Sequence, residues 1–576
     1  MNDIVLYNNS VRKLNLASGI MIFCLAGYYI VLLHIAWPNN GGAGVDLPYN
    51  LLAWSTITGL CAIVWFIFPS AFRLTLTPLV LLLFIGAALM SMPLLWSPTS
   101  VAFYNALPRI AGLWAGMFFL LSVRQLSFTE RHKQIFLYAL ISAGTIEALI
   151  VLFELYGPKL WLPLIWQQLI EKYSRGGVGV FQQVNVTSSF LAMALTLCLF
   201  LFASRKASLK NIKLERIRLS ALAGASILLS SVITLIYSRI GWLGGTIAII
   251  GTFIILSYSR FKHESRYQLW ILLLPIIGVF LGYHLMHYSV GEALAMHNGS
   301  NRQRILTLYQ TFIYSTHHPV IGYGAGTYEG YYQAFMARLQ DGNASRELMD
   351  HPHNELLYQY AEGGIIALAG LLLCYSLYVL LWIRAKTFMQ VVTLMAMLPI
   401  LFHTQVEYPL YYSVPHWIAL LLLIRLAEGE RSKHPVLNKK RFSPSVIIKS
   451  ALLLLALYGS TISLQAFEND KVLNKFENNE LTGSKEISAL HISWIQYLRY
   501  KQDLNLSLLL DFKDSHDKDY LRRFLKENMI FITVHPWPVF YSNEIAVLNY
   551  LHEYKKANEW LTRAHYILPW ESQFIR

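Results

Sequence analysis

Charged side chains are scarce in this sequence. Asp, Glu, Lys and Arg together make up 14% of the 576 residues, whereas a soluble globular protein carries about 25%. Hydrophobic residues reach 55%, and they gather in runs of roughly the 20 residues that a helix needs to cross a hydrocarbon core. The shortage of charge excludes an ordinary soluble protein and predicts an all-α polytopic membrane protein.

Cysteine is rare as well. The four cysteines all lie inside apolar runs, at Cys24, Cys61, Cys198 and Cys374. We expect them to be small core residues, since the exported loops predicted below contain none for a disulfide. The first apolar run is long and no small-residue cleavage site follows it, so we expect no cleavable signal peptide.

Acidic residues are outnumbered by basic ones, 33 against 47, which gives a formal net charge of +14. The basic residues concentrate in every second connection between the apolar runs. Lys159, Lys172, Arg175 and Arg239 are the main exceptions. By the positive-inside rule the basic connections and the N-terminus are cytoplasmic. The net charge is therefore largely a topological signal, and nucleic acid is not implied as a partner.

The apolar runs predict about thirteen membrane helices. They lie near residues 18–37, 51–69, 77–95, 106–122, 134–156, 186–203, 219–237, 241–257, 268–288, 363–382, 388–404, 410–426 and 445–466. An odd number of helices places the C-terminus on the exported side of the membrane.

Four regions follow from these helices. We predict about nine helices in residues 1–288, a large exported loop in 289–362, about four helices in 363–466 and an exported helical domain in 467–576. Near the end of that domain, Ala557, Ala564 and Pro569 are spaced as in a helical-hairpin repeat of the tetratricopeptide kind. Such a domain is a candidate docking surface for a protein partner.

The first stretch that could carry chemistry is "SRGGVGVFQQVN", in a short exported loop. Arg175 precedes a glycine cluster, and Gln182, Gln183 and Asn185 enter a membrane helix. Glycines let a backbone turn tightly and approach a ligand, so amide groups and Arg175 could face an anion. An ordinary re-entry turn is the alternative.

Two further stretches supply arginines. Arg239 stands in "YSRIGWLGG", a very short exported turn, where the alternative is an arginine whose head reaches the membrane surface. Arg302 and Arg304 open a predicted helix in "NRQRILTLYQ", and a Pro/Gly loop, "HHPVIGYGAG", follows with His318 as a further candidate for substrate binding. Because arginine binds two phosphate oxygens at once, arginines from three exported loops could form a diphosphate clamp.

The fourth stretch is "DHPHNELLYQYAEGG", at the entry of a membrane helix. Pro352 is tolerated in a first helical turn and His351 could cap it. His353 would then face the positive end of the helix dipole, which disfavours its protonation, and a neutral imidazole is a competent general base. Asn354 or Glu355 could orient the ring or the substrate. A polar helix entry with interfacial histidines is the alternative.

Three carboxylates lie close to or inside predicted membrane helices. Glu147 and Glu154 are seven residues apart on one helical face, which suits either a polar cavity or proton path or a paired structural role. Glu407, beside several tyrosines, could line an exported pocket. We find no set of metal ligands and no glycine-lysine motif of the P-loop kind, so neither a metal nor a nucleotide is expected.

These stretches, in this order, resemble the bacterial superfamily of O-antigen ligases and O-oligosaccharyltransferases. The matching pieces are "GVGVFQQVN", "SRIG", the arginine before "ILTLYQ", "HHPVIGYGAG" and "HPHNELLYQYAEGG". His353 and Asn354, followed by nine residues and Gly364, fit the histidine motif of that superfamily, and Ala367 departs from it. The resemblance covers roughly residues 170–430.

The resemblance implies a reaction. Members of the superfamily move a glycan from a polyprenyl (undecaprenyl) diphosphate lipid to an acceptor hydroxyl on the periplasmic face. It implies His353 as the essential histidine, with Arg175, Arg239 and Arg304 near the diphosphate. The spacing to Leu308 favours Arg304 over Arg302 for this place, and Arg302 stays a candidate for substrate binding.

Three acceptors occur in the superfamily: a lipid A core sugar, the growing glycan, and a Ser or Thr of a protein. The glutamine-asparagine helix entry and the C-terminal domain look like the branch that glycosylates proteins such as pilins. A transporter or flippase for a lipid-linked glycan is a rival of another class, although the chain shows no convincing internal repeat. A structural scaffold would explain neither the arginines nor the histidine motif.

Overall fold

The structure is a computed structural model of the chain. It describes residues 2–35, 44–69, 74–173, 177–258, 261, 263, 265–286, 298–339, 346–429, 444–478 and 484–575. Regular structure within these ranges is helical, apart from one isolated bridge between Ser204 and Ser265. The predicted all-α class is confirmed.

Eleven helices or helix pairs of the described chain are long and apolar enough to cross a membrane. They are built from α1 (Asn2–Ile30), α2 (Pro48–Ile67), α3 (Pro78–Ser91), α4 (Ser100–Arg124), α5 (Glu130–Tyr156), α7 (Val184–Ala203), α8 (Ile212–Leu235), α9 (Arg239–Thr246) with α10 (Thr252–Tyr258), α11 (Gln268–Leu285), α15 (Glu355–Arg384) and α19 (Pro444–Asn478). Two shorter apolar helices, α16 (Phe388–His403) and α18 (Val414–Glu428), occupy the remaining two predicted positions.

Local sequence explains where several of these helices begin. Thr99, Thr129 and Thr387 each accept a hydrogen bond from a backbone N–H in the first turn of α4, α5 and α16, which is the preferred chemistry of an N-cap. Proline stands in the first turn of α2, α3 and α18, where no backbone donor is lost.

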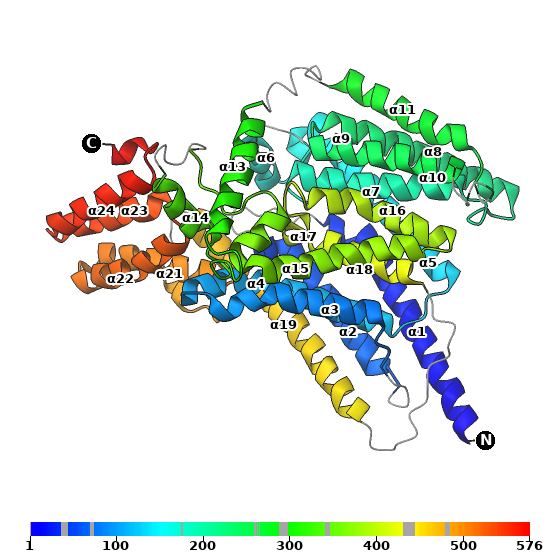
Figure 1. Ribbon diagram of the computed structural model, residues 1–576, viewed down its shortest axis with the longest axis horizontal. Coiled ribbons are helices and arrows are strands. Elements are labelled where there is room, and N and C mark those ends of the chain that lie inside the picture. The colour runs from blue at the N-terminus through cyan, green and yellow to red at the C-terminus, as the bar shows by residue number, and fades with distance from the viewer. Residues whose placement is uncertain are drawn as a thin grey trace.

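The spans run roughly side by side, and α7 lies at their centre. Figure 1 shows the spans as a layered bundle with the N-terminus at one end and a group of short helices, α20 to α24, at the other. All of the most apolar window of α7 is buried, and it packs against α5, α8, α9 and α16. We call the end with α20 to α24 the domain end and the opposite end the basic end.

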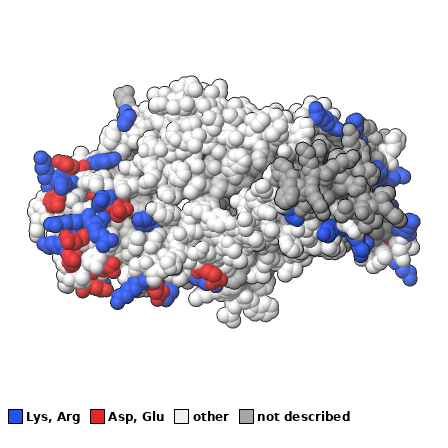
Figure 2. Space-filling model, turned by 90° about the horizontal axis from the view of Figure 1, so that it is seen from below, with Lys and Arg blue, Asp and Glu red and all other residues white. Residues whose placement is uncertain are grey.

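The surface carries little charge between these two ends. On the face drawn in Figure 2, Lys, Arg, Asp and Glu gather at the domain end, and Lys and Arg at the basic end, with a broad uncharged band between them. Many large apolar side chains of the spans are exposed, for example Phe66, Phe280 and Leu454. An uncharged apolar band is what a hydrocarbon core requires, so the chain is a multi-pass membrane protein.

Short helices cover the domain end of the bundle. They are α6 (Leu164–Tyr173), α13 (Asn298–Thr316), α14 (Tyr328–Ala337), α17 (Pro409–Tyr412), α20 (Ser484–Ser488), α21 (Tyr497–Ser515), α22 (Lys518–Val534), α23 (Pro538–Tyr550) and α24 (Tyr554–Ile567). In Figure 1, α13 runs across the direction of the spans. The helix α19 continues past residue 466, so no break separates the last span from the C-terminal domain.

Two buried polar contacts hold the C-terminal domain on the bundle. Glu329 of α14 accepts hydrogen bonds from Nδ1 of His535 at 2.6 Å and from Nε1 of Trp537 at 2.5 Å. The guanidinium of Arg499 in α21 forms ion pairs with three carboxylates: Asp46 at 2.8 Å, Asp470 at 2.5 Å and Glu477 at 2.7 Å. Breaking a buried pair leaves an unpaired charge, which is strongly destabilising. The domain is therefore a fixed part of this end.

The loop "HHPVIGYGAG" packs its backbone against a kink in α15. Gly364 has φ +58° inside this helix, and a Cβ there would lie 2.3 Å from the carbonyl carbon of Val320. In return, the N–H of Gly324 donates to the carbonyl of Glu362 at 2.9 Å. The two segments interlock because glycine lets the backbones touch.

Candidate active site

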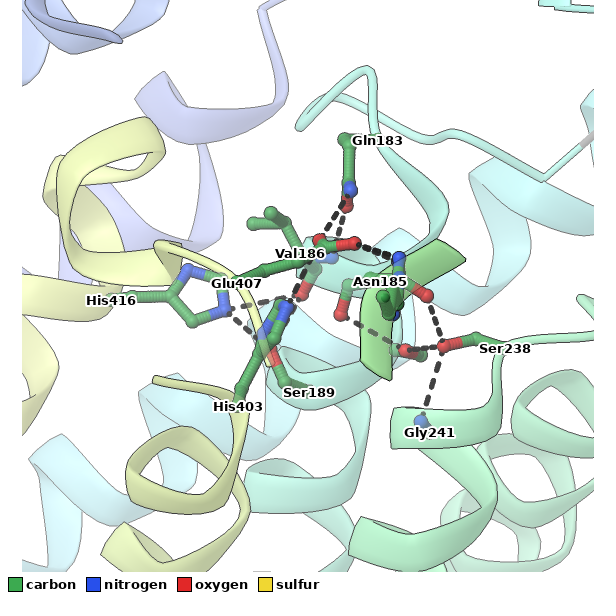
Figure 3. Close-up of polar contacts among 11 residues, drawn as sticks. Gln183, Asn185, Val186, Ser189, Ser238, Gly241, His403, Glu407 and His416 are labelled. Atoms are coloured by element: carbon green, nitrogen blue, oxygen red, sulfur yellow. Dashed lines mark hydrogen bonds and ion pairs between the residues drawn. The ribbon is translucent and has the colours of Figure 1, made fainter. Parts of the chain in front are cut away.

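Glu407 is the centre of a polar cluster at the domain end of the bundle. Its side chain lies just beyond α16 and is largely buried. Figure 3 shows polar side chains from several helices turned toward it. The partners of its carboxylate are Nδ2 of Asn185 at 2.7 Å, Nε2 of Gln183 at 2.7 Å, Nη2 of Arg304 at 3.1 Å and Nε2 of His403 at 3.4 Å.

The start of α7 supplies two of these partners. Gln183 is the N-cap of α7, because its Oε1 accepts the N–H of Val186 at 2.7 Å while its amide group donates to Glu407. Asn185 likewise uses both ends of its side chain, since its Oδ1 accepts the hydroxyl of Ser238 at 2.7 Å. Both side chains are therefore fixed in orientation, as Figure 3 shows.

Arg239 joins the cluster through the start of α9. Ser238 caps that helix by accepting the N–H of Gly241 at 3.1 Å, and Asn185 holds Ser238 in turn. The guanidinium of Arg239 interacts electrostatically with Arg304 and with Glu407. Two guanidinium groups from separate segments thus act on one carboxylate, Arg304 through an ion pair and Arg239 through its charge alone. This leaves an excess of positive charge that an anionic ligand can neutralise.

Glu407 is ionised in this setting. Burial alone would raise its pKa, but the hydrogen bond and charge of His403, the charge of Arg304 and the hydrogen bond from Gln183 lower it to about 2. The carboxylate is a permanent negative charge that holds the donors around it, because hydrogen bonds and opposite charges favour the ionised form.

His353 faces the same cluster. Its φ is +54°, which is uncommon for a residue with a side chain, and its Nδ1 is buried without a hydrogen-bond partner in the part of the chain that the structure describes. Burial, then the charges of His351 and Arg304, lower its pKa to about 4. The ring is therefore neutral at pH 7, and a neutral imidazole has one nitrogen that can accept a proton.

His351 lies beside His353 but points to other neighbours. The two ring centres are 4.6 Å apart, and the ring of His351 also packs on Tyr408 at 4.1 Å. Nδ1 of His351 pairs with the carboxylate of Asp350. An aspartate beside one ring nitrogen fixes the tautomer of a histidine and leaves the other nitrogen to accept a proton.

Asn354 and Glu355 have different places. Asn354 caps α15, because its Oδ1 accepts the N–H of Leu357 at 3.0 Å, and its amide donates to the carbonyl of Gln405. This cap starts α15 at Glu355. The predicted cap at His351, with Pro352 and His353 in the first turn, is therefore wrong, and hydrophobicity places the start eight residues too late. Glu355 accepts a hydrogen bond from Gln359 at 2.8 Å and lines the cavity described next.

A cavity of about 410 Å³ is lined by His351 and Tyr408 but by neither Arg239 nor Arg304. Its inner part is apolar and lies among α3, α4, α15, α16 and α18, with Leu83, Ala87, Leu113, Leu371, Met397 and Leu421 in its wall. Its outer part is polar, with Asn105, Arg109, Glu329, Asp350, His351, Glu355, His535 and Trp537. Arg109 is paired with Glu362, so its charge is already neutralised.

Two carboxylates of α5 fix the glycine segment that leads into α7. Glu154 accepts the N–H of Gly179 at 3.1 Å and Nε1 of Trp166 at 2.8 Å. Glu147 accepts the N–H of Val180 at 3.0 Å, and a Cβ on Gly179 would lie 1.9 Å from its Oε1. Of the two readings of these carboxylates, the observed contacts give them a structural task, since they hold the segment that carries Gln183.

The structure does not bring every candidate into the cluster. Arg302 is exposed on α13, and His318 packs on Tyr323 at 4.3 Å, in the loop that contacts α15. Gln182 has φ +57° at the turn before α7. Arg175 lies outside the described residues.

His403 and Ser238 belong to the cluster but escape sequence reasoning. His403 is fully buried and its Nδ1 lies 2.9 Å from the hydroxyl of Ser189. A signal did exist, because His403 and Glu407 are four residues apart and so can meet on one helical turn. In the part of the chain that the structure describes, no group of three or more His, Cys, Asp or Glu side chains is placed to hold a metal.

Two family models match the chain. The model described as O-Antigen ligase matches residues 224–372, which contain Arg239, Arg304 and His353. The model described as Virulence factor membrane-bound polymerase, C-terminal, matches residues 391–575, which contain Glu407 and the C-terminal domain. No curated protein sequence matches the chain.

Proposed function

Because the chain belongs to the superfamily of O-antigen ligases and polymerases, we propose that it is an O-oligosaccharyltransferase. It transfers a glycan from an undecaprenyl diphosphate carrier to a Ser or Thr hydroxyl of a periplasmic protein such as a pilin. The domains that match are those of enzymes that ligate or polymerise lipid-linked glycans, and the finer assignment is our own.

One observation carries this proposal. Arg239, Arg304, Glu407 and His353 come from four separate segments and meet at one end of the bundle. Paired guanidinium groups suit the two phosphates of the carrier, and a neutral imidazole beside them suits a general base. Arg175 belongs to this group by the same reasoning from the sequence.

The proposed reaction is an inverting displacement at the anomeric carbon of the glycan. The acceptor oxygen forms a bond to this carbon while the bond from the carbon to the diphosphate oxygen breaks. Arg239 and Arg304 stabilise the negative charge that grows on the departing diphosphate, and Nδ1 of His353 takes the proton of the acceptor hydroxyl. The diphosphate linkage provides the free energy, and we propose that neither a metal nor a nucleotide takes part.

The proposal fixes the orientation in the membrane. The domain end faces the periplasm, the basic end and the N-terminus face the cytoplasm, and the membrane is the bacterial inner membrane. The distribution of Lys and Arg supports this orientation, because basic residues concentrate on the cytoplasmic side.

The acceptor is a separate question. The C-terminal domain, fixed beside the site through Glu329, supports a protein acceptor because it offers a docking surface next to the cluster. The second candidate is polymerisation of the glycan itself, or ligation to a lipid A core sugar. The match of residues 391–575 to a polymerase family favours that candidate.

The test of the reaction is transfer by purified protein in detergent, with a defined lipid-linked oligosaccharide and a Ser/Thr peptide. The wild type is expected to form glycopeptide, and His353→Ala is expected to lose at least about 10²-fold in kcat, the usual contribution of a general base. His565→Ala, at an exposed position of α24, is the matched control and should retain activity.

A transporter would fail this assay, because detergent leaves no compartments to transport between. Transfer by His353→Ala at the wild-type rate would remove His353 from the reaction. Mass spectrometry of exported proteins and of lipopolysaccharide, from cells with and without the chain, then decides between the acceptors.

A further inference from the structure

Asp350 and His351 form an acid-imidazole pair that the proposed reaction does not use. Nδ1 of His351 pairs with the carboxylate of Asp350. The charge of His351 and its hydrogen bond to the carboxylate hold the pKa of Asp350 below its usual value. The pair thus links a carboxylate that is 62% exposed to a largely buried imidazole.

The segment 350–354 lies between the cluster around Glu407 and the cavity. On one side, His353 interacts with Arg304 and Glu407. On the other side, Asp350 and His351 line the cavity, whereas His353 does not. Tyr408 lines the cavity while its neighbour Glu407 binds the arginines. The two histidine rings, with centres 4.6 Å apart, therefore connect the cluster with the cavity.

The two rings have different surroundings. His353 is largely buried and lies near the guanidinium charge of Arg304. Both effects disfavour an imidazolium at this position. His351 has a carboxylate against Nδ1, and an ion pair of this kind stabilises an imidazolium. One ring away from His353 there is therefore an imidazole that is already paired with a carboxylate.

We propose that the Asp350–His351 pair is the final acceptor of the proton that the acceptor hydroxyl releases, with His353 as the intermediate. This inference rests on the proposed function and deepens it. It also assigns the cavity mouth as the side from which that proton leaves the site.

The proton transfer balances without a further reactant. The acceptor O–H bond breaks, and its proton forms an N–H bond at Nδ1 of His353, which then carries two ring protons. His353 loses one of them to the second ring nitrogen of His351, so His353 is neutral again. The new imidazolium of His351 stays paired with Asp350, and solvent at the cavity mouth takes the proton before the next cycle.

The first test is the kcat of His351→Gln in the detergent assay. We expect a fall of about tenfold to 10²-fold, the lower range of general acid-base effects, with the KM for the donor within about twofold of the wild type. His565→Gln, on the exposed face of α24, is the control. A kcat of the variant equal to the wild-type value would overturn the inference.

The second test separates proton transfer from a structural role. The pH profile of kcat/KM reports the free enzyme, so its acid limb reports the protonation of the groups that accept the proton. Asp350→Asn should shift that limb to lower pH, because the imidazolium of His351 loses its partner, and Asp350→Glu should restore it. The other titratable groups that face His351 are His353, Glu355, Tyr408 and Tyr412.

The outcomes of these tests are distinct. If Asp350→Asn lowers activity equally at every pH, the pair is structural and the inference is wrong. If the wild type is active, His353→Ala is inactive and the pair variants behave as the wild type, only this inference fails. If the wild type transfers no glycan, the proposed function itself fails.

Discussion

At the scale of the residue, the two buried carboxylates of α5 differ in the number of their oxygens that accept hydrogen bonds. Glu154 accepts N–H groups on both oxygens, whereas Glu147 accepts on Oε1, and its Oε2 is without a hydrogen-bond partner among the described residues. A glutamine keeps one accepting oxygen and replaces the other with an N–H₂ group, so the two positions should respond differently.

We predict that Glu154→Gln impairs transfer and Glu147→Gln does not. At position 154 the new amide would oppose a backbone or indole donor, and an unsatisfied buried group costs about 1–3 kcal/mol. The segment before Gln183 would shift, and we expect kcat/KM for the lipid-linked donor to fall about tenfold. Kinetics of both variants in detergent check this, with protein yield as the measure of folding. Equal activity of the two variants would show that the carboxylates do not position the segment.

The sequence predicted the individual residues of the cluster better than it predicted their contacts with one another. Arg239, Arg304, His353 and Glu407 were each candidates because their chemistry is unusual at a membrane surface, and the structure brings these four together. Glu407 as the common partner could not be predicted, because its contacts join segments more than a hundred residues apart. His318 was a candidate because of the motif in which it stands. It packs on Tyr323 instead, because the loop that carries this motif contacts the backbone of α15.

At the scale of the element, the kink of α15 decides how the histidine segment is held. Gly364 belongs to the histidine motif, and its φ of +58° brings the start of α15 against residues 319–324. A side chain at this position meets both backbone strain and the carbonyl of Val320.

We predict that Gly364→Ala lowers the thermal stability of the detergent-solubilised protein and abolishes most transfer activity. The strain of a positive φ and the contact at 2.3 Å with Val320 must be relieved by moving one segment, and such strain costs about 1–3 kcal/mol. Gly224→Ala, where nothing lies within 4 Å of the added Cβ, is the matched control. A melting temperature and activity equal to that control would show that the interlock has no role.

Hydrophobic runs predicted the existence of the elements well and their ends less well. All thirteen predicted positions hold an apolar helix, eleven of them long enough to span and two shorter. The start of α15 was predicted at Pro352 from the polar stretch and at residue 363 from hydrophobicity. Both positions are wrong, because Asn354 caps the helix and hydrophobicity carries no signal in a polar stretch. The length of α19 was missed for the same reason, since its last turns leave the apolar region and enter the C-terminal domain.

At the scale of the whole molecule, the charge distribution and the buried contacts act together. The basic end, the uncharged band and the domain end follow from composition along the chain, which the sequence shows directly (Figure 2). The attachment of the C-terminal domain through Glu329 and Arg499 joins residues about 200 and about 450 positions apart, so no local pattern could predict it. This attachment places His535 and Trp537 at the cavity mouth, beside Asp350 and His351.

The account as a whole depends on where the carrier diphosphate binds. The most direct measurement is a structure of the His353→Ala variant, which should not turn over, with an undecaprenyl-diphosphate-linked glycan bound. We predict both phosphates in contact with the guanidinium groups of Arg239 and Arg304, and the first sugar turned toward residue 353. Phosphates bound at the basic end, or anywhere beyond contact with both guanidinium groups, would contradict the account.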